Sequence, residues 1–199
     1  MNKILVSSIL TLAAPIALSA NAYIFGFEDL TAIEPAFTTS TSTFQLSSTG
    51  VTEGSFALEV TSQEFWDFQI NLPDPGAFWA ALGNEGLVYV DITSNEATGN
   101  TGFWGELTVA LQGDGVGWTQ LSSVGIWDTD GDTLTLDFST VDLSGAGMDW
   151  AQIIFSFNAN NGTTHYVDNL VVIPEPSQTA AALGLVALAA LIYVRRRRA

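Results

Sequence analysis

Carboxylates are the most abundant ionisable side chains in this chain, and the residues around them limit the chemistry that they can perform. The sequence contains 21 Asp and Glu residues and five Lys and Arg residues, and the basic ones are confined to Lys3 and 195–198. His165 is the only side chain between them that can carry a positive charge. Hard divalent cations bind about six to eight oxygen ligands, so this composition favours calcium chemistry. It disfavours nucleic acid, phosphate and other polyanions, which need basic side chains.

A run of carboxylates at alternate positions is one candidate cation site. Asp128, Asp130 and Asp132 are separated by single residues and are able to surround one ion. The run lacks the downstream Glu and the Gly placement of an EF-hand loop, which excludes that motif. The alternative is a plain hairpin turn between two strands, and the sequence leaves both interpretations open.

Six tryptophans form the second group of interest. Sugar rings stack on exposed indoles, while neighbouring carboxylates and amides bind hydroxyl groups. Four tryptophans lie beside Gly, Ala or Asp in expected loops and are candidate sugar-binding residues: Trp79, Trp104, Trp118 and Trp127. The alternative for each of them is ordinary packing in the core or at its rim.

Catalysis has little support in this composition. The chain has no Cys and, between its two ends, no Lys, so thiolate and Schiff-base chemistry are excluded there. A single histidine also excludes histidine-rich zinc sites. Two carboxylates can hydrolyse a glycosidic bond, but in so acidic a chain a suitable pair arises by chance. We therefore expect a non-enzymatic protein, with a glycosidase as a distant alternative.

Alternating segments predict the elements that must position these side chains. In segment 66–72 apolar residues occupy every second position, which predicts Trp66 in the core and Asp67, Gln69 and Asn71 at the surface. Further strands are expected at 23–27, 44–46, 56–60, 87–92, 107–111, 119–122, 134–138, 153–157 and 166–172.

The spacing of these strands predicts the fold class. A helical turn is expected at 78–82, and 38–48 is expected to be a loop or an edge segment. Many short strands separated by turn residues are typical of an all-β, two-sheet antiparallel β-sandwich. Residues 23–173 have the length of a single domain with a full core.

Residues 1–22 have the layout of a secretory signal peptide. Lys3 provides the charged start, 4–18 are apolar, and Ala20-Asn21-Ala22 offers small residues where a signal peptidase reads them. We expect processing by signal peptidase and a mature chain that begins at Tyr23. The alternative is a buried N-terminal helix.

The C-terminal residues 174–199 combine three features. The tripeptide Pro174-Glu175-Pro176 is followed by an apolar run at 179–194, and the arginines follow as Arg195, Arg196, Arg197 and Arg198. At about 1.5 Å per residue this run is marginally short for a hydrocarbon core of about 30 Å, so we expect a short transmembrane helix. The arginines would hold its end in the cytoplasm and leave the acidic domain across the membrane. A soluble helix with a basic tail is the alternative.

This C-terminal arrangement resembles the PEP-CTERM sorting signal of Gram-negative bacteria that make exopolysaccharide. The resemblance implies recognition by an exosortase, a membrane-embedded cysteine protease-transpeptidase that cuts near the PEP tripeptide. It implies an inner-membrane intermediate with the domain on the periplasmic side. The processed protein would then reach the cell envelope surface or the extracellular matrix.

Three strings in the middle of the chain carry a second resemblance. Gly26-Phe27-Glu28-Asp29 opens the domain, the segment 53–60 follows, and the segment 166–172 closes it. These landmarks are similar to those of the galactose-binding-like jelly roll of many carbohydrate-binding modules. The resemblance implies that the first and last strands lie side by side and that Glu28 and Asp168 hold a structural calcium. Carbonyl ligands are then implied near Glu53 and Ser55.

Two functions are consistent with these features. The first is a calcium-stabilised module that binds a neutral polysaccharide or exopolysaccharide. The second is a structural matrix or surface-layer protein, cross-linked by divalent cations, that has no specific sugar pocket.

Overall fold

The computed structural model describes residues 22–63, 66–83, 86–94, 105–126, 129–158 and 162–173. Several predicted features lie outside these residues: the signal peptide at 1–21, the PEP tripeptide, the apolar run 179–194, the arginines 195–198, Trp104, Trp127 and Asp128. Within the described ranges, no helix has the length and apolar character needed to cross a membrane.

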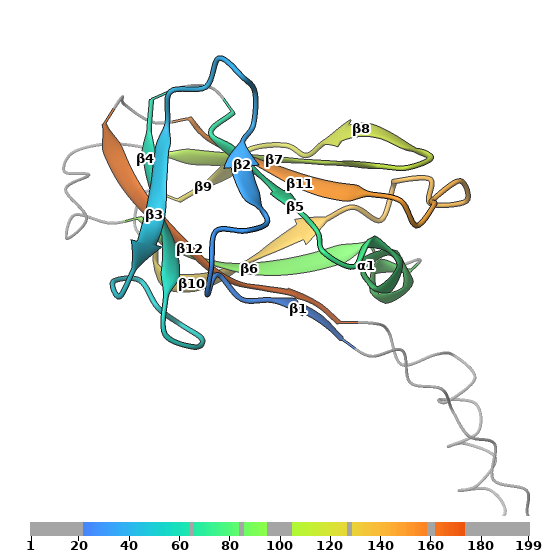
Figure 1. Cartoon of the computed structure of the whole chain (residues 1–199), viewed down its shortest axis with the longest axis horizontal. Helices are drawn as coiled ribbons and strands as arrows, with labels where there is room; N and C mark the ends of the chain where they lie inside the picture. Colours follow the sequence, from blue (N-terminus) through green and yellow to red (C-terminus); the bar gives the residue numbers. More distant parts are fainter. Residues whose placement is uncertain are drawn as a thin grey trace, which may run out of the picture. The chain divides into compact units, whose positions relative to one another are not determined.

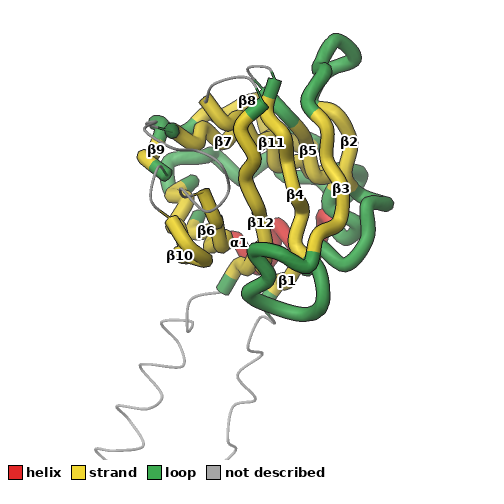
Figure 2. The backbone as a smooth tube through the Cα atoms, turned by 90° about the vertical axis from the view of Figure 1, so that its left-hand side faces the viewer, coloured by secondary structure: helices red, strands yellow, loops and turns green. Residues whose placement is uncertain are grey.

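Two antiparallel sheets form the domain, as the alternating pattern predicts. In sheet A the strands follow the order β10-β6-β12-β4-β3, and β1 pairs with β12. In sheet B the order is β2-β5-β11-β7-β8, and β9 pairs with β7. Figure 1 shows β7, β8 and β11 of sheet B in one layer and β1, β6 and β12 of sheet A in the other, and Figure 2 gives the view at 90°.

The strands have the following bounds. Sheet A consists of β1 (Tyr23–Phe25), β3 (Thr43–Ser47), β4 (Ala57–Ser62), β6 (Leu87–Ser94), β10 (Thr129–Asp137) and β12 (Thr163–Val172). Sheet B consists of β2 (Ile33–Pro35), β5 (Phe68–Asn71), β7 (Glu106–Gly113), β8 (Val116–Gln120), β9 (Val124–Gly125) and β11 (Ala151–Asn158).

The first and last strands lie side by side, as the jelly-roll resemblance implies. Tyr23 is opposite Val172, and Phe25 is opposite Leu170, in an antiparallel pair. This pairing joins the two ends of the domain within one sheet. It also brings residues that are far apart in the sequence, such as Glu28 and Asp168, to the same side of the molecule.

The core lies between the sheets and follows the period-two pattern of the strands. In sheet B, Phe68 of β5 stacks on Phe155 of β11 with ring centroids 4.8 Å apart. Ile70 and Ile153 continue the same inward rows and are fully buried. Each large apolar side chain buried in this way contributes roughly 1.5–3 kcal/mol.

One helix, α1 (Pro75–Leu82), leaves the end of β5 and is longer than the helical turn expected at 78–82. Asp74 caps its first turn by accepting a hydrogen bond from the Ala77 N–H at 2.9 Å. Pro75 follows the cap at a position where its missing N–H is tolerated. The Pro-Asp-Pro-Gly string that indicates a turn therefore also starts a helix.

The prediction that Asp67 lies at the surface is wrong, because its side chain is fully buried. Trp66 adopts a left-handed backbone conformation with φ of 75°, so regular alternation begins only at Phe68. The Asp67 carboxylate accepts hydrogen bonds from the Ser42 hydroxyl at 2.6 Å and from the Phe157 N–H at 2.7 Å. Desolvation on burial raises the pKa of this carboxyl, and the hydrogen bonds from its partners oppose that rise.

The alternative of a hairpin turn at 128–132 is also wrong for the described residues 129–132. Thr129, Asp130 and Asp132 belong to β10, which pairs with β6. The register shifts between Asp130 and Asp132, and Gly131 between them has a φ of 73°. Such a bulge inserts one residue into a strand and leaves both carboxylates exposed here.

Candidate functional site

A row of amide side chains crosses three strands of sheet B on the face away from the core. Gln112 of β7 is opposite Gln152 of β11, which is opposite Asn71 of β5. Residues directly opposite one another point to the same face of a sheet. Gln112 Nε2 donates to Gln152 Oε1 at 2.8 Å, and Gln152 Nε2 donates to Asn71 Oδ1 at 2.6 Å. We call these three residues the amide ladder.

The next row on the same face begins with polar residues and continues with apolar ones. Gln69 of β5 is opposite both Glu34 of β2 and Ile154 of β11, and its side-chain amide lies 3.5 Å from the Glu34 carboxylate. Ile154 is opposite Ala110 of β7, and both side chains are buried although they lie outside the main core. Other side chains therefore cover the centre of this face.

Two tryptophans provide that cover. Trp66 packs with Ile154, Ala110 and Ala36 in a small apolar cluster separate from the main core. Trp118 of β8 meets Trp66 edge-to-face, with ring centroids 5.0 Å apart and planes at 82°. Trp118 is 43% exposed, whereas Trp66 is buried. Trp66 thus supports an exposed indole beside the amide ladder.

Trp150 extends the same face at its far end. It directly precedes β11, and its carbonyl accepts a hydrogen bond from the Asp114 N–H at 3.0 Å, which continues the pairing of β11 with β7. It stands two positions before Gln152, so the pleat of the strand puts both on one face. Trp150 is 43% exposed. We define the Trp–amide face as Trp66, Trp118, Trp150, Gln69 and the amide ladder.

The Trp–amide face has the chemistry of a site for polyhydroxylated, uncharged ligands. Each primary amide carries two N–H donors and one carbonyl acceptor, so the hydrogen bonds within the ladder use only part of its capacity. The exposed indoles offer flat apolar surfaces to the C–H faces of a ring. No Lys or Arg lies between Lys3 and Arg195, so nothing here attracts an anionic ligand.

The predicted tryptophans do not gather at one place. Trp118 lies on the Trp–amide face, whereas Trp79 is 8% exposed and belongs to α1. Trp66 is buried as predicted, but it packs on the outer face of sheet B rather than between the sheets. Trp150 was missed as a candidate. Its position two residues before Gln152 at the start of an alternating strand is the signal that identifies it.

The residues implied as calcium ligands contact one loop, 52–56. Glu28 Oε1 accepts hydrogen bonds from the N–H groups of Ser55 at 2.7 Å and Phe56 at 3.3 Å. Asp168 Oδ2 accepts from the N–H groups of Thr52 at 2.7 Å and Glu53 at 2.9 Å. The structure therefore brings both carboxylates to the segment that the resemblance names.

A second carboxylate, which the sequence did not single out, lies beside Asp168. Asp91 of β6 is directly opposite Asp168 of β12, and both are buried. The Thr52 hydroxyl lies 2.6 Å from Asp91 Oδ2 and 3.2 Å from Asp168 Oδ2. Asn169 Nδ2 also donates to Asp91 Oδ2, at 3.0 Å. We call Glu28, Asp91, Asp168 and the loop 52–56 the carboxylate cluster.

This cluster fits calcium in its donor type but not in its present arrangement. Calcium requires several oxygen ligands directed at one point, whereas these carboxylate oxygens face N–H and O–H donors. Among the described residues, no group of three Asp, Glu or His side chains is placed to hold a metal ion. Calcium binding at Glu28 and Asp168, or at Asp130 and Asp132, stays a prediction.

Comparisons with known proteins address the fold. No protein-family model matches the sequence, and no curated protein matches it. A family 11 carbohydrate-binding module from Clostridium thermocellum, solved with a β-1,3-1,4-mixed-linked tetrasaccharide, is similar in structure with a TM-score of 0.52. The sequences are 19% identical, and the match covers 77% of this chain and 95% of that one.

A second solved structure gives the same result. The module CBM27-1 of Caldicellulosiruptor saccharolyticus, in complex with mannohexaose, has a TM-score of 0.52 at 16% identity. This match covers 79% of this chain and 99% of that one. The described domain therefore has the two-sheet jelly-roll fold that is found in these carbohydrate-binding modules.

Proposed function

We propose that the domain is a non-enzymatic carbohydrate-binding module and that its Trp–amide face binds a neutral glycan. The observation that carries this proposal is the exposed Trp118, supported edge-on by Trp66, beside hydrogen-bonded amides on one sheet face. Indole surfaces supply stacking area, and amides bind hydroxyl groups in fixed directions. The proposal assigns no reaction to the protein.

The fold supports the class of ligand without naming it. The two similar modules described above were solved with a mixed-linked tetrasaccharide and with mannohexaose. At below 20% identity these ligands do not transfer directly to this chain. The charge of the protein narrows the class of ligand to uncharged polysaccharides, because a net charge of −16 for the whole chain repels acidic ones.

The cellular location of the protein is a separate part of the proposal and is supported by the sequence alone. We propose export through a signal peptide and sorting by an exosortase that recognises 174–199. The protein would pass through an inner-membrane intermediate to the cell surface or extracellular matrix. Replacing the arginines 195–198 with Ser tests this part, and unchanged export, retention and processing would contradict it.

The glycan proposal is tested by binding of the full chain to a panel of neutral polysaccharides, which includes mixed-linked β-glucan, mannan and the host's own exopolysaccharide. A zwitterionic detergent is used, because sugar-based detergents would compete. Trp118→Ala is expected to weaken binding about 5–30-fold through loss of stacking area. Ile24→Ala is the control, since Ile24 is an exposed apolar residue of β1 in the other sheet and its loss is expected to leave binding unchanged.

The same panel separates the module from the structural alternative. Binding that Trp118→Ala weakens, and that the control variant does not, supports recognition at the Trp–amide face. Calcium-driven self-association of the full chain, with no binding to any polysaccharide, would instead favour a matrix protein cross-linked by divalent cations. Parallel measurements in calcium and in chelator also test the calcium prediction.

A further inference from the structure

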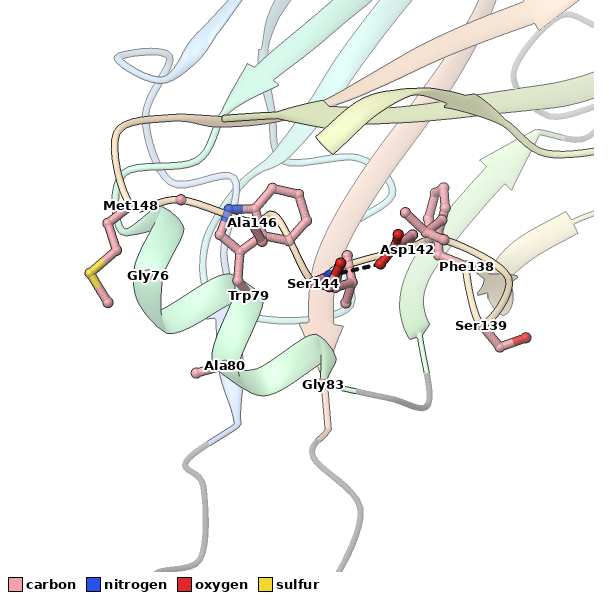
Figure 3. A pocket seen from close by; sticks show the side chains of 13 residues that line it. Gly76, Trp79, Ala80, Gly83, Phe138, Ser139, Asp142, Ser144, Ala146 and Met148 are labelled. Carbon is pink, nitrogen blue, oxygen red and sulfur yellow. Dashed lines mark hydrogen bonds between the residues drawn. The ribbon is translucent and has the colours of Figure 1, made fainter. Parts of the chain in front are cut away.

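A pocket of about 580 Å³ lies between α1 and the segment that joins β10 to β11, apart from the Trp–amide face. α1 contributes Gly76 and Trp79 to its lining, Gly83 follows directly after the helix, and Asp142 and Met148 are among the residues on the opposite wall. Figure 3 shows the Trp79 indole between the helix and this segment. Small-molecule sites typically have volumes of roughly 300–1,000 Å³, so this pocket is large enough for one.

The aromatic wall of the pocket is held in position by its neighbours. The ring of Trp79 packs against Phe78 with centroids 4.9 Å apart. On its other side lies Gly113 of β7, where an added Cβ would be 2.3 Å from Trp79 Cζ2. A residue with any side chain at position 113 would displace the indole. The ring is therefore preorganised rather than free to rotate.

The opposite wall is attached to the turn between β7 and β8. The Gly147 N–H donates to the Asp114 carbonyl at 2.8 Å, and an added Cβ at Gly115 would lie 1.7 Å from the Gly145 carbonyl oxygen. Within the wall, Asp142 Oδ1 accepts a hydrogen bond from the Ser144 N–H at 2.9 Å. These close approaches give the segment a defined shape with Asp142 and Ser144 beside the pocket.

Trp79 also has an unpaired polar group. Its Nε1 is buried, and no hydrogen-bond partner lies within reach among the described residues. A buried donor without a partner is uncommon and costs about 1–3 kcal/mol. Met148 lies at the rim, 78% exposed, with side-chain atoms about 3.5 Å from the position of a Cβ added at Gly76. Met148 therefore forms the rim of the pocket beside Gly76, at the start of α1.

We propose that this pocket binds a single neutral sugar ring, such as the end of a glycan chain, independently of the Trp–amide face. The part of the Trp79 indole that lines the pocket would contact the ring carbons, and its buried N–H would donate to a hydroxyl oxygen after a small adjustment of the surrounding wall. Asp142 and Ser144 line the same space, and their side-chain oxygens would pair with further hydroxyl groups. The carboxylate disfavours anions, and no basic residue compensates for it.

The test follows the tryptophan indole N–H signals of the full chain by NMR. The protein is labelled with ¹⁵N-tryptophan in zwitterionic detergent, which gives one indole signal for each of its six tryptophans. Trp79→Phe and Trp118→Phe assign the two signals that matter. The probes are the methyl glycopyranosides of glucose, galactose, mannose and xylose, each added to about 100 mM, because a single ring typically binds with a millimolar dissociation constant.

We expect at least one of these probes to move the Trp79 indole proton downfield and saturably. Asp142→Asn keeps an oxygen for the Ser144 N–H but removes the charge, so it should weaken this binding about fivefold. Trp118→Ala removes the exposed indole of the Trp–amide face and should leave the Trp79 titration unchanged.

Three outcomes would overturn the inference. The first is a Trp79 signal that none of the four probes moves. The second is a titration that Asp142→Asn leaves unaltered in a variant whose other indole signals are unperturbed. The third is a response to choline, a cation, without one to any sugar. Failure of glycan binding at Trp118 would leave this result untouched, so the two proposals are separable.

Discussion

The Trp–amide face and the carboxylate cluster use similar oxygen-rich chemistry in opposite ways. On the face, the amides of Gln112, Gln152 and Asn71 are partly exposed, and their mutual hydrogen bonds leave donors and acceptors for a ligand. In the cluster, Asp91 and Asp168 are buried, and protein N–H and O–H groups surround their oxygens. Spare hydrogen-bonding capacity suits recognition, whereas fully used capacity suits structure.

The largest effect is expected when the buried region loses a carboxylate. Asp168→Ala would remove the acceptor for the N–H groups of Thr52, Glu53 and Asn169. Hydrogen bonds to a charged group contribute roughly 1.5–3 kcal/mol each, and these three are part-buried, so the free energy of unfolding should fall by about 3–5 kcal/mol. Urea unfolding of the full chain measures this change.

Asp149→Ala, at an exposed position, is the matched control and should change stability by less than about 0.5 kcal/mol. Both variants are compared with the parent chain in calcium and in EDTA. Equal stability of the parent in both would indicate that hydrogen bonds alone hold the loop 52–56. A calcium-dependent stabilisation that Asp168→Ala removes would support the calcium prediction instead.

A second test uses pH, because β12 also carries a buried histidine. His165 stacks on Phe157 at 4.3 Å and contacts the hydroxyls of Ser94 and Thr163. Burial lowers the pKa of His165 from 6.5 to about 4. The unfolded chain therefore binds this proton first, and stability should fall as the pH drops from about 6.5 to 4, by up to about 3 kcal/mol.

Protonation of Asp67 has the opposite effect on stability over part of the same pH range. Its folded-state pKa is raised, so its contribution is greatest below the ordinary value of 3.8 and is lost as the pH rises through the folded value. His165→Gln retains polar contacts without the titration. This variant should lose the decline between pH 6.5 and 4, and a decline that persists would exclude His165 as its source.

The smallest effect on stability is expected on the Trp–amide face. Gln152→Ala breaks both hydrogen bonds of the amide ladder at a half-buried position. The free energy of unfolding should therefore fall by no more than about 1 kcal/mol. Glycan affinity should nevertheless fall several-fold. Titration calorimetry and urea unfolding on the same variant measure both. A large loss of stability would mean that the ladder, like the carboxylate cluster, is structural.

Local sequence patterns predicted most of the strands because burial imposes a period of two on them. The rows through Phe68, Ile70 and Ile153 are buried as expected. The short strands β2 and β9 were missed, since three and two residues are too few to show a period. Pro35, the last residue of β2, also has no N–H to donate to a neighbouring strand.

The candidate site was harder to predict, because its members come from separate strands. Gln69 and Asn71 were expected on the surface, but only the register of β5, β11 and β7 joins Asn71 to Gln152 and Gln112. Trp66 was expected in the core, yet its left-handed conformation puts it under Trp118 on the outer face. Asp91 lay inside an expected strand, with no sign that Asp168 stands opposite.

By itself, the sequence determined the fold class, the acidic charge that excludes polyanionic ligands, and the PEP tripeptide, apolar run and arginines behind the predicted address. These properties depend on composition and on local periodicity, which need no partner elsewhere in the chain. Only the tertiary structure decided which tryptophan is exposed, which carboxylates are buried among hydrogen-bond donors and which amides lie side by side. Those properties depend on strand register and on loop packing, and both are set by contacts between residues far apart in the sequence.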